Sequence, residues 1–292
     1  MASSVARSRS QATPDAGYNG LMEQTLQVRG LRLTNLLLMI CAIAIIGGWT
    51  LYTQSGVLGK TDAVGYAICH RIGERSFSAF GRQLPMCARC TGIYLGVMLG
   101  LFVTIASGRA RAARFASWRV NGMLGLFVLL MGLDGLNSFV SLIPGVEGIY
   151  HTTNALRVTT GVFCGFTIIN LVLPSFNQSV WVDGGAPLPT LRSLRELAGL
   201  SLLGILMVAI VLAENSLILL VLGIISAVGV LIVLTMIMTV IVISLGRMER
   251  RYTAWRELRM PALAGFTLAI GVIFAVNVAR YSATGTWDGF VF

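Results

Sequence analysis

A short segment of the chain holds three of its five cysteines in a pattern that could bind a metal ion or carry redox chemistry. Cys87 and Cys90 are three residues apart at a predicted helix start, so their sulfurs share one face within a single turn. With Cys69 and His70, they supply the ligand types and number of a tetrahedral site for one zinc or similar soft divalent ion. Adjacent residues of an extended chain point in opposite directions, so Cys69 and His70 can share a metal only where the backbone turns. We predict a metal site at Cys69, His70, Cys87 and Cys90.

Two other interpretations of this cysteine segment remain open. In the first, Cys87 and Cys90 cycle between thiols and a disulfide, with Cys69 as exchange partner, in a membrane thiol-disulfide oxidoreductase. The helix start and the nearby Arg75 and Arg89 favour thiolates in this interpretation as they do in the metal site. In the second, the cysteines form a permanent disulfide or buried thiols without chemistry.

The composition is that of a membrane protein. Hydrophobic residues make up 55% of the 292 residues and charged residues only 12%, whereas soluble domains carry roughly 25% charged residues. These values exclude an ordinary soluble fold and an intrinsically disordered chain. The net charge of +10 is spread between apolar runs, which favours contact with a lipid bilayer over nucleic-acid binding.

Seven apolar runs are long enough to cross a bilayer, because a span needs about 20 mostly apolar residues. They predict an all-α polytopic bundle of seven transmembrane helices, the sixth of them a single long helix. The runs are Leu33–Gly59, Cys90–Gly108, Val120–Val146, Val158–Val182, Leu197–Ala213, Asn215–Gly246 and Met260–Ala279.

Basic residues orient the predicted bundle. Of the 22 Lys and Arg residues, roughly two thirds lie in the N-terminal tail and in the loops on its side of the membrane. This bias predicts a cytoplasmic N-terminus, an outer C-terminus and an outward-facing cysteine segment. The predicted organisation is a cytoplasmic, disordered tail (1–32), a four-helix membrane unit with the cysteine segment (33–175), a cytoplasmic linker (176–195) and a three-helix extension without chemistry (196–292).

Polar residues gather near the predicted outer ends of the third and fourth spans. Asp134 lies inside the third span, where an aspartate costs about 2.5–3.5 kcal/mol and therefore usually has a partner. We favour a structural ion pair with Arg157 over a proton- or substrate-handling role. Asn137 and Asn154 lie at the same predicted level, and His151 is either an interfacial residue or a further ligand or proton carrier.

Glycines predict where two of the spans meet. Gly92, Gly96 and Gly100 recur every four residues on the second span, as Gly161 and Gly165 do on the fourth. Small faces of this kind let helix backbones approach closely in a membrane.

Four segments resemble a family of bacterial and archaeal membrane proteins that is defined as a domain of unknown function. They read C-H-R-I-G-E-R-S, G-R-Q-L-P-M-C-A-R-C-T-G-I-Y-L-G, L-D-G-L-N-S and N-A-L-R-V-T-T-G, and roughly residues 60–170 are covered. The chain has Arg71 where the family pattern has Gln. The resemblance implies a polytopic membrane protein and no established reaction.

We therefore expect a multi-pass protein of the plasma membrane of a bacterium or archaeon, acting alone or as a subunit of a larger membrane complex. A transporter or scaffold subunit is a further alternative, because Asp134, Asn137 and the glycine faces could line a path.

Overall fold

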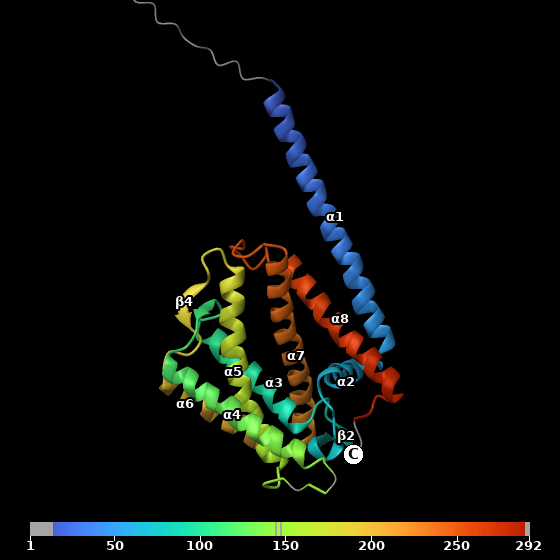
Figure 1. Cartoon of the computed structure of the whole chain (residues 1–292), viewed down its shortest axis with the longest axis vertical. Coiled ribbons are helices and arrows are strands. Elements are labelled where there is room, and N and C mark those ends of the chain that lie inside the picture. The colour runs from blue at the N-terminus through green and yellow to red at the C-terminus, as the bar shows by residue number, and fades with distance from the viewer. Residues whose placement is uncertain (1–13, 144, 147, 290–292) are drawn as a thin grey trace, which may run out of the picture.

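The computed structural model describes residues 14–143, 145–146 and 148–289, with side chains from residue 33 onward. This part of the chain forms a helical bundle with two very small sheets (Figure 1). The helices are α1 (Pro14–Tyr52), α2 (Gly56–Ile68), α3 (Ala88–Ala106), α4 (Trp118–Val140), α5 (Asn154–Val180), α6 (Leu194–Leu212), α7 (Ser216–Leu245) and α8 (Arg259–Thr284). The strands are β1 (Ser78–Ala79) and β2 (Arg82–Gln83), which form a hairpin, and β3 (Ala112–Arg114) and β4 (Ala186–Pro189), which pair in parallel.

Within the described residues, seven helices are long and apolar enough to cross a membrane, which confirms the predicted all-α bundle. They are the Leu33–Tyr52 part of α1 and the whole of α3 to α8. The sixth span is one helix of 30 residues, as predicted. It begins after Asn215, whose side chain accepts hydrogen bonds from the backbone N–H groups of Leu217 and Ile218 and so caps the helix.

The first helix differs from the prediction at both ends. The apolar run Leu33–Gly59 is broken after Tyr52, and Gly56 (φ 79°) starts the separate helix α2, because glycine tolerates the left-handed backbone needed there. Helix also covers residues 14–32, where a disordered tail was predicted. Proline suits the first helical position, and the Leu, Met, Gln and Glu residues that follow favour helix. Residues 1–13 of the predicted tail lie outside the described residues.

Helices α3 and α5 form the centre of the bundle through the predicted glycine faces. A β-carbon on Gly92 or Gly96 of α3 would overlap backbone atoms of α5, and one on Gly161 or Gly165 of α5 would overlap backbone atoms of α3. In the most apolar stretch of α5, 61% is buried inside the protein, whereas only 11% is buried in the most apolar stretch of α1, at the edge of the bundle. The two helices thus pack backbone to backbone, which fixes the position of the first turn of α3.

The three C-terminal helices pack into this centre and do not form a separate extension. Helix α7 contacts α3 and α5, while α8 contacts α1, α2 and α7 (Figure 1). Helix α7 is apolar around its whole circumference, and such a helix is stable when it is buried among others. The connection between α5 and α6 is shorter than the predicted linker 176–195, because α5 continues to Val180. Within this connection, β4 pairs with β3.

One end of the bundle gathers the elements that carry the cysteine segment. The end of α2, the β1–β2 hairpin, the start of α3 and the end of α8 lie together there, opposite the α7–α8 connection (Figure 1). Which end faces the cytoplasm stays a prediction from the charge bias.

Candidate metal centre

The three cysteines come from two elements that meet at this end of the bundle. Cys69 directly follows α2 with an extended backbone (φ −134°, ψ 144°). Cys87 is the N-cap residue of α3, and Cys90 lies in its first turn. A β-carbon on Gly65 of α2 would overlap the carbonyl oxygen of Pro85. Glycine therefore allows α2 to lie close enough to the start of α3 to bring the cysteines together.

The sulfur atoms of Cys69, Cys87 and Cys90 all lie within 4.8 Å of one another. Cys69 and Cys87 are buried and Cys90 is half-buried. The sulfur of Cys69 accepts hydrogen bonds from the backbone N–H groups of Arg71 (3.4 Å) and Cys87 (3.3 Å). Three of the four predicted ligands are therefore adjacent in the fold, and one of them is held by two backbone donors.

The ionisation of the thiols outside the membrane span is interdependent. Hydrogen bonds with Cys69 and Cys90 hold the pKa of Cys87 well below its usual range. The hydrogen bond with Cys87 and burial raise the pKa of Cys69 to about 11. One thiolate is thus favoured at the expense of its neighbour, and a bound cation would stabilise both negative charges at once.

His70 does not join the sulfur atoms. Its side chain is exposed, while its backbone carbonyl accepts a hydrogen bond from Nη2 of Arg280 at 3.3 Å. The backbone is extended at Cys69, so the next side chain points to the other side of the chain. Cys69 and His70 could bind the same ion only if the backbone turned between them, but the backbone turns one residue later, at Arg71 (φ 53°).

Arg280, near the end of α8, holds the chain around Cys69 in place. Its Nη1 atom donates to the carbonyl oxygens of Tyr66 and Cys69, both at 2.6 Å. Its guanidinium also lies over the Tyr66 ring, 4.0 Å from the ring centre, within range of a cation–π interaction. The sequence patterns missed this residue because it lies outside the cysteine segment; its only signal was a lone arginine near the end of the last span.

Apolar side chains from α7 and α8 enclose the cysteines. Cys69 and Cys87 belong to a buried cluster with Ala227 and Val230 of α7 and with residues of α8. The members from α8 are Ile270 and Ile273, and Trp49 and Met86 complete the same wall. The last spans, predicted to take no part in the chemistry, therefore supply much of the low-dielectric surroundings of the sulfurs.

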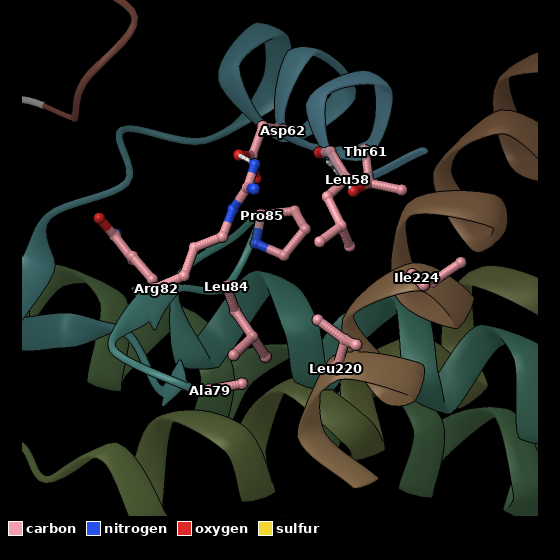
Figure 2. Close-up of a pocket in the computed structure, with 10 residues that line it drawn as sticks. Leu58, Thr61, Asp62, Ala79, Arg82, Leu84, Pro85, Leu220 and Ile224 are labelled. Atoms are coloured by element: carbon pink, nitrogen blue, oxygen red, sulfur yellow. Dashed lines mark hydrogen bonds and ion pairs between the residues drawn. The ribbon is translucent and has the colours of Figure 1, made fainter. Parts of the chain in front are cut away.

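Asp62 of α2 forms ion pairs with the segment that connects α2 to α3. It is buried and forms ion pairs with Arg71 (3.3 Å) and with Arg82 of the hairpin. Figure 2 shows Arg82 reaching up toward Asp62 beside Pro85. The pocket there has a volume of about 20 Å³, enough for about one water molecule, so we assign it no ligand. Asp62 was not singled out in the sequence, although it is an acidic residue close to a cluster of arginines.

The predicted ion pair between Asp134 and Arg157 is absent from the described residues, where Asp134 pairs with Arg89 instead. Arg89 also donates to the backbone carbonyl of Asp134 at 3.2 Å, and the Tyr150 hydroxyl donates to Oδ1 of Asp134 at 3.1 Å. The correction has a simple cause: α3 begins at Ala88, ahead of the predicted start, so Arg89 lies in its first turn and reaches α4. The buried pair links the start of α3 to α4.

The remaining predicted residues organise the loop before α5. Asn137 of α4 accepts a hydrogen bond from the backbone N–H of Ile149 (2.7 Å) and donates to the carbonyl of Tyr150 (2.8 Å). Asn154 donates to the carbonyl of Glu74 at 3.3 Å. His151 is exposed at the side of the same loop, and it is not among the residues grouped with the sulfurs.

Comparison with known proteins places this site within a matched segment. Residues 69–171 match a family model described as "Predicted membrane protein (DUF2085)". An uncharacterized protein of Methanocaldococcus jannaschii is 31% identical over 121 residues, which cover 41% of this chain and 70% of that protein. An uncharacterized protein of Methanothermobacter thermautotrophicus is 34% identical over 99 residues, which cover 34% of this chain and 78% of that protein. No solved structure matches the chain.

Proposed function

We propose that this chain, which belongs to the DUF2085 family of predicted membrane proteins, binds one thiophilic metal ion through Cys69, Cys87 and Cys90. Zinc is the ion we expect. The observation that carries the proposal is the mutual approach of the three sulfurs within 4.8 Å. In a tetrahedral zinc site with Zn–S bonds of about 2.3 Å, sulfurs lie roughly 3.8 Å apart. The cluster therefore needs little movement to close around an ion.

The surroundings of the sulfurs support the same proposal. Two backbone N–H groups donate to the Cys69 sulfur, and such donors stabilise a thiolate ligand. Buried thiolates without a cation would be costly in the apolar wall formed by α7 and α8. A divalent ion would offset these charges.

Three cysteines leave one position of a tetrahedral ion for a further ligand. An open fourth position is typical of zinc sites that bind water or a substrate. We propose that this position accepts water or a group from another subunit of a membrane complex.

The metal content of purified protein tests this proposal. Protein prepared anaerobically with zinc present is expected to retain about one equivalent, and Cys69→Ser and Cys90→Ser are each expected to lose it because one of three ligands is removed. Cys164→Ser, in which a buried cysteine of α5 is changed outside the cluster, is the matched control and is expected to retain the ion. Metal-replete wild-type protein without a stoichiometric ion would contradict the proposal.

The second candidate function is thiol–disulfide exchange, favoured by the position of Cys87 at the N-terminus of α3 with Cys90 in the same turn. A thiolate is stabilised at this position. The Cys87 thiolate would attack a substrate disulfide to form a mixed disulfide. Cys90 would then displace the second substrate thiol, leaving the substrate reduced and Cys87–Cys90 oxidised. Trapping of a mixed disulfide in Cys90→Ser, together with no retained metal, would favour this candidate over metal binding.

A further inference from the structure

A second polar site lies beside the cysteines, in a cavity of about 670 Å³ between the start of α5, the end of α4 and the turn Gly73–Arg75. This volume is in the range of small-molecule binding sites. Its wall is mostly polar, with Arg75, Ser141, Tyr150, His151, Thr152 and Arg157 among the lining residues.

Two arginines in this wall converge on one hydroxyl group. Nη1 of Arg75 donates to the Ser138 hydroxyl (3.1 Å) and backbone carbonyl (2.8 Å). Nη2 of Arg157 donates to the same hydroxyl at 3.4 Å, and its Nη1 donates to Oδ1 of Asn154 at 2.9 Å. Arg157 is only 8% exposed, and its Nε atom is buried without a hydrogen-bond partner among the described residues.

Neither arginine has an acidic partner in the part of the chain that the structure describes. The ion pairs found there involve five other arginines, and Asp134 is already paired with Arg89. Glu74 also lines the cavity but forms no ion pair in the described residues and is exposed. Burial and the repulsion from Arg89 both lower the pKa of Arg75, and an anion bound beside its guanidinium would offset this repulsion.

Further positive potential comes from the backbone. Helix α5 begins at Asn154, at the wall of the cavity, and a helix N-terminus carries a partial positive charge. The Thr152 and Ser141 side chains supply hydroxyl groups on the same wall. The cavity therefore combines two guanidinium forks, hydroxyl groups and a helix N-terminus, all of which favour an oxyanion.

We propose that this cavity binds the phosphate group of a phosphorylated small molecule or of a lipid headgroup, with Arg75 and Arg157 as its principal contacts. Planar guanidinium forks match the oxygens of a phosphate group, and two of them balance the charge of a phosphate monoester, close to −2 at neutral pH. The cavity is larger than a phosphate ion, so the rest of the molecule occupies the remaining volume. Neither metal binding nor redox activity at the cysteines is needed for this inference.

The test uses the full chain in nanodiscs of neutral phosphatidylcholine. Inorganic phosphate and glycerol phosphate are titrated by calorimetry, and parallel discs containing phosphatidylglycerol are examined for retained lipid by native mass spectrometry. Binding in the first arm identifies a soluble phosphate compound as the ligand, and selective lipid retention in the second identifies a headgroup. Arg75→Gln and Arg157→Gln are each expected to weaken binding by about tenfold or more.

The matched control is Arg195→Gln, which removes an exposed arginine of α6 and is expected to leave binding unchanged. Melting temperatures with and without phosphate separate binding from folding: a ligand role predicts that phosphate stabilises wild-type protein and fails to stabilise Arg157→Gln. Arg75→Gln, at a less buried position, covers the case in which Arg157→Gln does not fold. The proposal is overturned if neither phosphate compounds nor phosphatidylglycerol bind, or if both arginine variants bind like the control.

Discussion

At the scale of single residues, the buried pair between Arg89 and Asp134 is the clearest electrostatic feature of the bundle. Asp134 is 2% exposed and Arg89 16% exposed along their side chains, so water screens the pair only weakly. The sequence indicated that Asp134 needs a partner, because a carboxylate within a span rarely stays alone. The predicted partner, Arg157, was wrong, since the contact with Arg89 joins residues 45 positions apart in different helices.

This pairing predicts a specific pattern of stability. Asp134→Asn is expected to lower the free energy of unfolding by about 3–5 kcal/mol, because it leaves the Arg89 guanidinium buried without a counter-charge. Adding Arg89→Gln is expected to recover much of that loss, whereas adding Arg157→Gln is not. Denaturant unfolding in detergent measures these differences. Recovery by Arg157→Gln, with none by Arg89→Gln, would restore the pairing that the sequence suggested.

For the cysteines as well, the sequence predicted which residue types form the site but not their exact geometry. Their types and spacing were enough to predict a site, and the structure brings Cys69, Cys87 and Cys90 together. The exclusion of His70 depends on the extended backbone at Cys69 and on the turn at Arg71. Backbone angles of single loop residues are not encoded in a pattern of residue types.

At the scale of elements, the packing of α3 on α5 was predictable and the existence of α2 was not. Regular glycine spacing is a signal within one helix, so it can be recognised without knowledge of the partner. Helix α2 was hidden because the apolar run continues from α1 across the break. Its anchor is Lys60, which donates to the carbonyl oxygens of Thr50 (2.5 Å) and Thr53 (3.2 Å) at the end of α1.

The glycine contacts predict a strong effect of a single methyl group. In Gly165→Ala, the new β-carbon would overlap the backbone of Ile93, so we expect a loss of about 1–3 kcal/mol in the free energy of unfolding. The matched control is Gly125→Ala in α4, where nothing lies within 4 Å of the added carbon; it is expected to be neutral or slightly stabilising. Equal effects of the two variants on unfolding would contradict close packing of α3 and α5.

At the scale of the whole molecule, the C-terminal helices complete a site whose sequence signal lies entirely in the N-terminal half. Arg280 and Cys69 are 211 positions apart, yet they share a hydrogen bond. Local patterns of composition and spacing do not contain contacts of this kind, so the last spans were predicted to carry no chemistry. The number of spans was predictable because each corresponds to a long, mostly apolar run.

The charge bias also predicts the topology of the whole chain in the membrane. A reporter enzyme that is active only outside the cytoplasm is expected to be active when fused after Phe292 and silent when inserted between α7 and α8, where Arg residues concentrate. Both fusions are compared for expression by immunoblot as the control. Activity at the α7–α8 position, or silence after Phe292, would reverse the orientation.

X-ray absorption spectroscopy at the zinc edge of the loaded protein measures whether the three cysteine sulfurs bind one ion. We expect about three sulfur ligands at about 2.3 Å and one lighter ligand at about 2.0–2.2 Å, with one sulfur fewer in any zinc that Cys69→Ser still binds. A first shell made only of nitrogen and oxygen, or one with a single sulfur, would contradict it.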